Sequence, residues 1–114
     1  MIKGKCHCET VKYESINESE AAAFCHCGTC RKINGSAFGS SAVIPEEGFK
    51  IISGETSLKK YESSPGKIRF FCSNCGTHIF ATSSKNPGKM ILRIGCIDGN
   101  HGIVPTRHIW ISQK

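Results

Sequence analysis

Eight cysteines in 114 residues constrain this sequence more than any other feature. Seven of them form three short groups, and in chain order these groups are Cys6 and Cys8; Cys25, Cys27 and Cys30; and Cys72 and Cys75. Pairs with such gaps are typical of zinc ligands, because a short turn can aim several thiolate sulfurs at one tetrahedral ion. The first and third groups together supply four thiolates, which is a complete set, and the middle group supplies three.

The set of four predicts a closed structural zinc site. Gly76 follows Cys75 directly, as in a zinc knuckle, where glycine lets backbone amides turn toward the sulfurs. The two pairs lie about sixty residues apart, so a shared metal would join distant parts of the chain. Closing so long a loop restricts the unfolded ensemble, and the energy of metal binding at such a site becomes folding energy.

The set of three allows two interpretations. It is either a structural site completed by a ligand from elsewhere, or a site with an open coordination position. Because the three cysteines are local and join nothing distant, the second interpretation suits them better. Zinc with three thiolates activates water poorly, but a substrate thiol bound there would lose its proton and become nucleophilic.

The formal charge of +6 suggests nucleic acid at first sight. Two zinc ions and seven thiolates would lower it to about +3, and the basic residues are scattered along the sequence. We therefore expect Lys and Arg on solvated strand faces, and no nucleic-acid partner. Arg31 and Lys32 follow Cys30 directly and are the candidate cofactor-binding pair, placed to hold the carboxylates of a small anionic thiol such as glutathione.

The sequence also predicts where the protein resides. No signal peptide precedes the first cysteine pair, and no apolar stretch approaches the length of a membrane span. Close cysteine pairs without a leader favour metal over disulfides. We expect one soluble cytoplasmic domain over residues 1–114 that holds two zinc ions and has no membrane partner.

Many short alternating segments with turn signals about every ten residues predict an all-β domain. The expected strands are 11–14, 38–44, 49–53, 58–62, 67–72, 78–82, 90–96 and 106–111, with turns at 45–48 and 63–66. Residues 21–24 form a buried segment for which helix is also allowed. Residues 31–35 predict a helical turn that ends at Gly35 in a left-handed conformation.

These motifs resemble one family over nearly the whole chain. The residues that carry the resemblance are Gly4-x-Cys6-x-Cys8, Cys25-His26-Cys27-x-x-Cys30-Arg31-Lys32, Gly35-Ser36-Ala37-Phe38, Ser63-Ser64-Pro65-Gly66, Phe71-Cys72-Ser73-x-Cys75-Gly76 and Pro105-x-x-His108-Ile109-Trp110. The family is that of the glutathione-dependent formaldehyde-activating enzymes and centromere protein V-like proteins.

The resemblance implies a β-tent fold of small antiparallel sheets. It implies that Cys6, Cys8, Cys72 and Cys75 hold a structural zinc, and that Cys25, Cys27 and Cys30 hold a second, catalytic zinc. The implied activity is that of a carbon–sulfur lyase of the type that joins glutathione and formaldehyde into S-hydroxymethylglutathione.

Two alternatives stay open. In an interaction module both zincs would be structural and the surface would bind a protein or nucleic acid. A zinc-containing methionine sulfoxide reductase would need a free nucleophilic cysteine, and only Cys96 is unassigned. We expect Cys96 to be a small core residue in a buried strand. His26 and His7 are expected to point away from the metals, and His108 is a candidate to face the pocket.

Overall fold

The computed structural model describes residues 1–99, 103 and 107–109 of the chain, the last three by their backbone. Its strands are β1 (Ile2–Lys5), β2 (Lys12–Ser15), β3 (Ala21–Cys25), β4 (Gly39–Pro45), β5 (Phe49–Ser53), β6 (Leu58–Ser64), β7 (Lys67–Cys72), β8 (His78–Ser83), β9 (Lys89–Arg93) and β10 (Arg107–Ile109). The helices are α1 (Gly28–Asn34) and two short 3₁₀ segments, η1 (Glu55–Ser57) and η2 (Ile94–Cys96).

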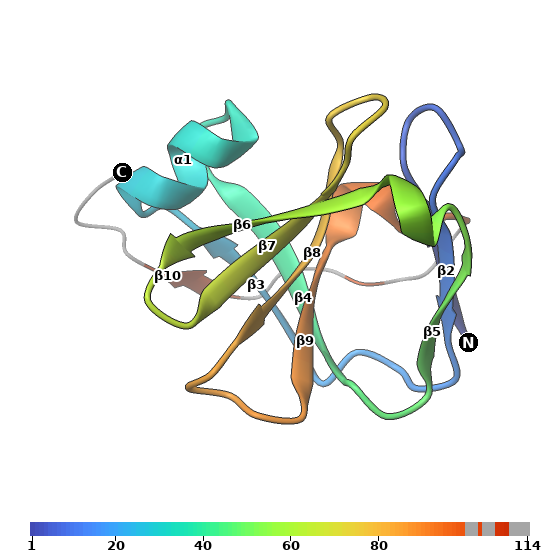
Figure 1. Cartoon of the computed structure of the whole chain (residues 1–114). Helices are drawn as coiled ribbons and strands as arrows, with labels where there is room; N and C mark the ends of the chain where they lie inside the picture. The colour runs from blue at the N-terminus through green and yellow to red at the C-terminus, as the bar shows by residue number, and fades with distance from the viewer. Residues whose placement is uncertain (100–102, 104–106, 110–114) are drawn as a thin grey trace.

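The strands form two sheets, which confirms the all-β prediction. One sheet has the order β1-β2-β5, and the other has the order β10-β3-β4-β9-β8-β7-β6. Figure 1 shows the small sheet on the opposite side of the molecule from β10. All pairs are antiparallel except β10 with β3, which is parallel. The sheets are therefore antiparallel as expected, apart from this one pairing at the edge.

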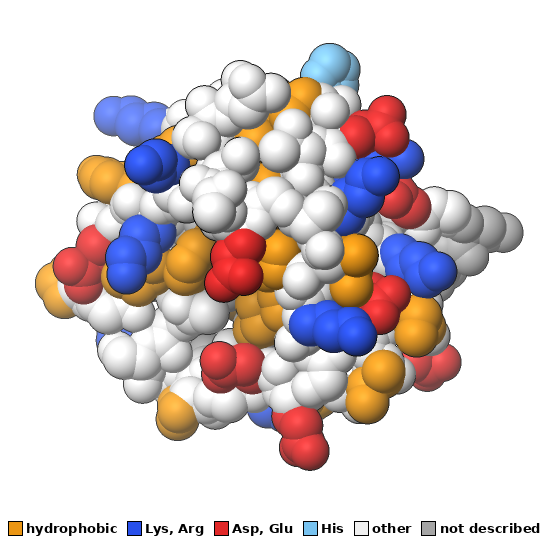
Figure 2. Space-filling view, turned by 45° about the vertical axis from the view of Figure 1, so that its right-hand side comes forward, with side chains coloured by type: hydrophobic (Ala, Val, Ile, Leu, Met, Phe, Trp, Pro, Cys, Tyr) orange, Lys and Arg blue, Asp and Glu red, His pale blue; other side chains and the backbone are white. Residues whose placement is uncertain are grey.

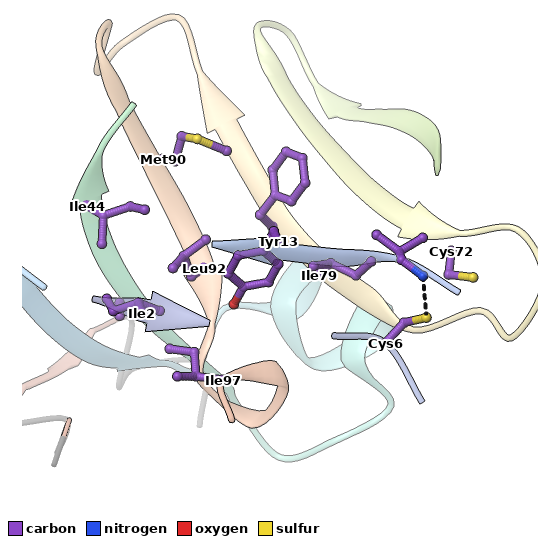
Figure 3. Close-up of a cluster of buried hydrophobic side chains, with 12 residues drawn as sticks. Ile2, Cys6, Tyr13, Ile44, Cys72, Ile79, Met90, Leu92 and Ile97 are labelled. Atoms are coloured by element: carbon purple, nitrogen blue, oxygen red, sulfur yellow. Dashed lines mark hydrogen bonds between the residues drawn. The ribbon is translucent and has the colours of Figure 1, made fainter. Parts of the chain in front are cut away.

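The hydrophobic core lies between the two sheets. Tyr13 of β2 is 1% exposed, and Figure 3 shows its ring beside Leu92 of β9. Gly4 makes this packing possible, because a Cβ there would lie 2.4 Å from the Tyr13 ring. Cys6 and Cys72 belong to the same buried cluster. The first cysteine group thus joins the core directly.

Strand alternation gives the seven-stranded sheet two chemically different faces. The face toward the core carries apolar side chains in register, such as Ala42, Leu92 and Phe80. The other face carries Arg93 of β9 and Arg69 of β7, although both arginines are buried. The expectation that basic residues lie on solvated strand faces was wrong at these two positions.

The large sheet is strongly curved. Cys25 of β3 and Arg69 of β7 are separated by three intervening strands, yet both line one cavity. The guanidinium of Arg69 also lies 3.9 Å from the Sγ of Cys30, which is in α1 at the end of β3. Curvature therefore brings side chains from the far strands to the helix that contains the third cysteine of the middle group.

Several predicted boundaries move in the structure. The expected strand 90–96 ends at Arg93, because the chain turns into η2, where Ile97 N donates to Ile94 O. Residues 21–25 form a strand and not a helix, since they pair with β4 along their whole length. Strand β6 continues to Ser64, so the turn is shorter than expected. The C-terminal strand is described only over residues 107–109.

The predicted helical turn with Gly35 at its end is confirmed. Gly35 has φ 59°, in the left-handed region, and its amide donates to the carbonyl groups of Arg31 and Lys32. Within the described residues, no helix is long and apolar enough to cross a membrane. On the face of the molecule in Figure 2, lysine and arginine side chains are interspersed with carboxylates, so neither charge forms a continuous patch there.

Candidate metal centres

The structure brings Cys6, Cys8, Cys72 and Cys75 together in what we call the four-cysteine cluster. Their four Sγ atoms all lie within 4.8 Å of one another. The sulfur of Cys8 is 3.6 Å from that of Cys6 and 3.8 Å from that of Cys72. Zinc–sulfur bonds of about 2.3 Å place the sulfurs of a tetrahedral site about 3.8 Å apart. All eight cysteines are free thiols, so the donor set and its spacing fit zinc.

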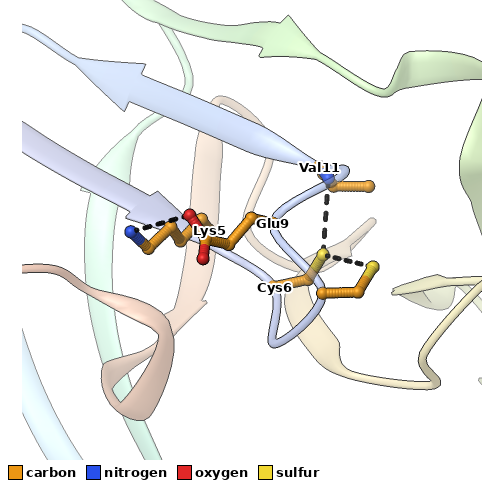
Figure 4. Close-up of polar contacts among 5 residues, drawn as sticks. Lys5, Cys6, Glu9 and Val11 are labelled. Carbon is orange, nitrogen blue, oxygen red and sulfur yellow. Dashed lines mark hydrogen bonds and ion pairs between the residues drawn. The ribbon is translucent and has the colours of Figure 1, made fainter.

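Neighbouring groups prepare these sulfurs for a cation. Val11 N donates to Cys6 Sγ over 3.3 Å. Figure 4 shows this bond beside the contact of Cys6 Sγ with Cys8 Sγ. The Thr77 hydroxyl, 3.1 Å from Cys75 Sγ, lowers the pKa of Cys75 to about 5. Burial raises the pKa of Cys6 to about 11. A metal must therefore displace a proton from Cys6, whereas the lowered pKa of Cys75 makes its proton easier to lose.

The knuckle turn after Cys72 has the predicted form. Gly76 has φ 80°, a conformation that L side chains rarely adopt, and its amide donates to Cys72 O over 2.8 Å. Cys72 N donates in turn to Thr77 O. The turn also reaches the first cysteine pair, since Asn74 Nδ2 donates to Cys8 Sγ over 3.2 Å.

Cys25, Cys27 and Cys30 form a second group, the three-cysteine cluster, with all three Sγ atoms within 4.8 Å of one another. Cys25 ends β3, Cys27 caps α1, and Cys30 lies buried in the first turns of that helix. Cys27 Sγ accepts a hydrogen bond from Cys30 N over 3.3 Å. One short connection from strand to helix thus aims three sulfurs at one point, and this donor set also fits zinc.

The three sulfurs differ in acidity. Burial raises the pKa of Cys25 to about 12. Burial also acts to raise the pKa of Cys27, but hydrogen bonds, first that from Cys30 N, outweigh it and leave this pKa lowered. Metal binding at the three-cysteine cluster must therefore remove a proton from Cys25, so it weakens as the pH falls.

The three-cysteine cluster opens on a cavity of about 550 Å³. The rest of its wall comes from the β6–β7 turn, from β7, and from the end of β8 with the turn that follows it. This wall includes Lys67, Arg69 and Lys85. A neighbouring hollow of about 350 Å³ shares Cys25, Cys30 and Lys67, and adds Arg93. Cavities of this size are typical of small-molecule sites.

The cations beside the cysteines are thus not those that follow Cys30 in sequence. Arg31 and Lys32 line a separate hollow with Gly28, Ser36 and Ala37. Lys67, Arg69 and Arg93, which we call the cation cluster, face the three-cysteine cluster instead. Sequence reasoning missed them because they come from strands far along the chain. The available signal was the alternation of Lys67 and Arg69 with apolar residues in one strand.

Close packing fixes the position of Arg93. Its Nη1 donates to Ser41 Oγ over 2.7 Å. A Cβ on Gly39 would lie 2.8 Å from Asn34 Nδ2, 3.3 Å from Arg93 Nη1 and 3.5 Å from Cys30 Cβ. Asn34 Nδ2 also donates to Cys30 O over 2.8 Å. The absence of a side chain at Gly39 is what lets the guanidinium approach the helix that contains Cys30.

The remaining candidates have other surroundings. His26 is 2% exposed and packs against the ring of Phe38, at 5.4 Å between centroids. Cys96 lies in η2 and is only partly buried, so the prediction of a core residue in a strand was wrong. Burial raises the pKa of the Cys96 thiol to about 11, which makes it a poor nucleophile at neutral pH.

Of two further histidines, His78 lies within the described residues in full and His108 by its backbone alone. His78 begins β8 and stacks on Phe71, with 5.5 Å between ring centroids. It lines a hollow together with Arg93 and Cys96, although no sequence motif pointed to it. The side chain of His108 lies outside the described residues, as do Pro105 and Trp110.

Known proteins are similar to this chain in sequence, and one solved structure is similar in fold. An uncharacterized lyase of Schizosaccharomyces pombe is 33% identical over 87 residues, which cover 75% of this chain and 61% of that protein. A candidate glutathione-dependent formaldehyde-activating enzyme of Colletotrichum graminicola is 31% identical over 83 residues, with coverage of 71% and 44%. The chain therefore spans less than two thirds of the length of each of these relatives.

A crystal structure of a Rhodobacter sphaeroides protein has the same fold, with a TM-score of 0.75 at 22% identity, over 93% of this chain and 98% of that one. The family model described as glutathione-dependent formaldehyde-activating enzyme matches residues 1–113. The chain belongs to the family of glutathione-dependent formaldehyde-activating enzymes.

Proposed function

We propose that this chain is a zinc-dependent carbon–sulfur lyase-type enzyme that acts on thiol adducts. Cys25, Cys27 and Cys30 would hold the catalytic zinc, and the four-cysteine cluster would hold a structural one. One observation carries the proposal: within the described residues, three sulfurs converge without a fourth cysteine, histidine or carboxylate, and they face a cavity. Because all eight cysteines are free thiols, we also propose a reducing compartment such as the cytoplasm.

Zinc held by three thiolates would supply a soft acceptor at which a substrate thiol is bound as its thiolate. The reaction that such a site serves is the addition of sulfur to an aldehyde. The carbon–sulfur bond forms, the carbonyl π pair moves to oxygen, and the proton lost by the thiol ends on that oxygen. The reverse reaction cleaves the carbon–sulfur bond of the hemithioacetal. Neither direction needs an oxidant or reductant.

The chain's own residues would position and confine the substrate. The turn from β3 into α1 fixes the three sulfurs. The β6–β7 turn supplies part of the cavity wall, through Ser64, Pro65 and Lys67. Relatives are named for glutathione and formaldehyde, and we propose a glutathione-like thiol and a small aldehyde as the substrates here.

Cobalt substitution tests the proposal, because a thiolate that joins cobalt adds a sulfur-to-metal charge-transfer band. Glutathione should strengthen this band in the cobalt-loaded protein, and S-methylglutathione, whose sulfur carries no proton, should leave it unchanged. The same glutathione addition to a Cys27→Ser variant loaded with one cobalt should have no effect. An unchanged spectrum at saturating glutathione would indicate a closed site and favour the interaction module.

A further inference from the structure

The cation cluster has no carboxylate side chain paired with it among the described residues. Arg69 is 4% exposed and Arg93 is 7% exposed, whereas arginine is rarely buried without an anionic partner. The ion pairs of the described residues join Lys5 with Glu9, Lys50 with Glu14 and Lys89 with Glu20. None of these ion pairs includes Lys67, Arg69 or Arg93, so within the described part of the chain the cation cluster forms no ion pair with a carboxylate.

The hydrogen bonds leave donors unused as well. Arg69 Nε donates to Ser63 Oγ over 2.8 Å, and its Nη2 lies 3.9 Å from Cys30 Sγ. Its Nη1 is buried and has no hydrogen-bond partner among the described residues. A buried guanidinium donor that lacks a partner costs free energy. The arrangement is therefore poised to accept an anion from outside the chain.

The three cations act on one another and on the cysteines. The pKa of Lys67 is lowered, first by burial and then by the charges of Arg69 and Arg93. The pKa of Arg93 is also lowered, first by burial and then by the charge of Arg69. For both Lys67 and Arg93, the negative charges of Cys30 and Cys25 act in the opposite direction and raise the pKa. The cation cluster and the three-cysteine cluster thus form one electrostatic group across the two hollows.

The thiolates balance only part of this charge. Three thiolates around a divalent zinc leave a single net negative charge, against three cations in the cation cluster. Positive charge remains in excess beside the position at which a substrate sulfur would bind. A guanidinium presents its donors as a planar fork that matches a carboxylate.

We propose that Lys67, Arg69 and Arg93 form a carboxylate subsite beside the three-cysteine cluster, so that this protein selects thiols bearing a negative charge. The choice of a thiol as ligand rests on the proposed function, whereas the carboxylate subsite rests on the buried cations themselves. Arg31 and Lys32, in their separate hollow, would contribute little to this selection.

The first test compares two thiols on the cobalt-loaded protein, 3-mercaptopropionate and its methyl ester, in which a methyl group removes the negative charge. The free acid should bind at least about tenfold more tightly than the ester, since charge-assisted hydrogen bonds reach this strength. Lys67→Gln should remove most of that preference. Lys67 makes no side-chain hydrogen bond or ion pair within the described residues, so this variant should keep its fold.

Matched controls change a lysine elsewhere. Lys59→Gln, at an exposed position of β6, and Lys32→Gln should both keep the preference for the acid. Equal affinity of acid and ester in the wild-type protein would overturn the carboxylate subsite while leaving thiol binding intact. Loss of the preference in Lys32→Gln but not in Lys67→Gln would overturn it too, in favour of the pair next to Cys30.

A second measurement does not depend on sulfur chemistry. In the zinc-loaded protein, 3-(methylthio)propionate, which cannot supply a thiolate, should shift the Nε–H resonances of Arg69 and Arg93 in ¹⁵N–¹H spectra. The corresponding methyl ester should not shift them. If thiols leave the cobalt spectrum unchanged while the carboxylate still shifts these resonances, the proposed function fails and the subsite stands. If the carboxylate shifts neither arginine, the subsite is overturned.

Discussion

The two cysteine clusters use the same ligand chemistry in opposite surroundings. The four-cysteine cluster is continuous with the hydrophobic core, and Cys6 and Cys72 are at most 1% exposed. It connects the loop after β1 with the turn after β7. The three-cysteine cluster lies on one connection, from β3 to α1, and opens on a cavity walled by cations. Cysteine content alone therefore does not distinguish the two clusters, which differ in what surrounds them and in what they connect.

The largest expected difference comes from removing one sulfur from each cluster. Cys72→Ser should abolish cooperative folding, since an isosteric hydroxyl cannot replace the thiolate and structural zinc contributes about 10 kcal/mol or more of folding energy. Cys27→Ser should stay folded and lose one equivalent of zinc. Urea denaturation followed by circular dichroism, with elemental analysis of zinc, measures both. Equal destabilisation by the two variants would remove the contrast between the clusters.

Replacing a glycine near each cluster by alanine should give a smaller difference in unfolding free energy. Gly54 has φ 79°, and a Cβ there would meet Thr10 O, in the loop that carries Cys8, at 2.2 Å. Since backbone cannot yield easily, Gly54→Ala should cost about 2–4 kcal/mol of unfolding free energy. Gly39→Ala meets the movable Asn34 side chain and should cost about 1 kcal/mol, with a weakened second metal site. Urea midpoints test the order, and a larger loss for Gly39→Ala would contradict it.

Side chains that hydrogen-bond the cysteine sulfurs should change the affinity of the cluster for its metal. Thr77→Val removes the hydroxyl that lowers the pKa of Cys75, so protons compete better with the metal. We expect roughly tenfold weaker zinc binding at the four-cysteine cluster. A chelator competition in the Cys27→Ser background isolates this site. Thr82→Val, in strand β8 that follows Thr77, is the matched control and should leave the affinity unchanged.

The smallest expected effect is a pH dependence at His78, which follows the knuckle turn. Burial, and then the charges of Arg93 and Arg69, hold the pKa of His78 below 6.5. The unfolded chain therefore takes up this proton first, so the contribution of His78 to stability is complete above pH 6.5 and declines as the pH falls below it. His78→Phe, which keeps the stack on Phe71, should lose less stability than the wild type between pH 7.5 and 5.5. Parallel pH profiles would contradict this assignment.

Local sequence determined the features that depend on neighbouring residues. The gaps within each cysteine group, and Gly76 after Cys75, predicted how the sulfurs would converge, because a short turn fixes their separation. Gly35 ended the helical turn as predicted, since its left-handed conformation suits glycine. Alternation located most strands, although their ends moved by a few residues, as strand ends depend on partners.

Only the tertiary structure decided which charges meet the three-cysteine cluster. Arg31 and Lys32 adjoin Cys30 in the sequence, but the helix directs them to a separate hollow. Arg69 and Arg93 reach it because strand register places them on the non-core face and sheet curvature closes that face around Cys30. Register and curvature arise from pairings between segments far apart in the chain. No local pattern could therefore predict that Arg69 and Arg93 would be buried close to Cys30.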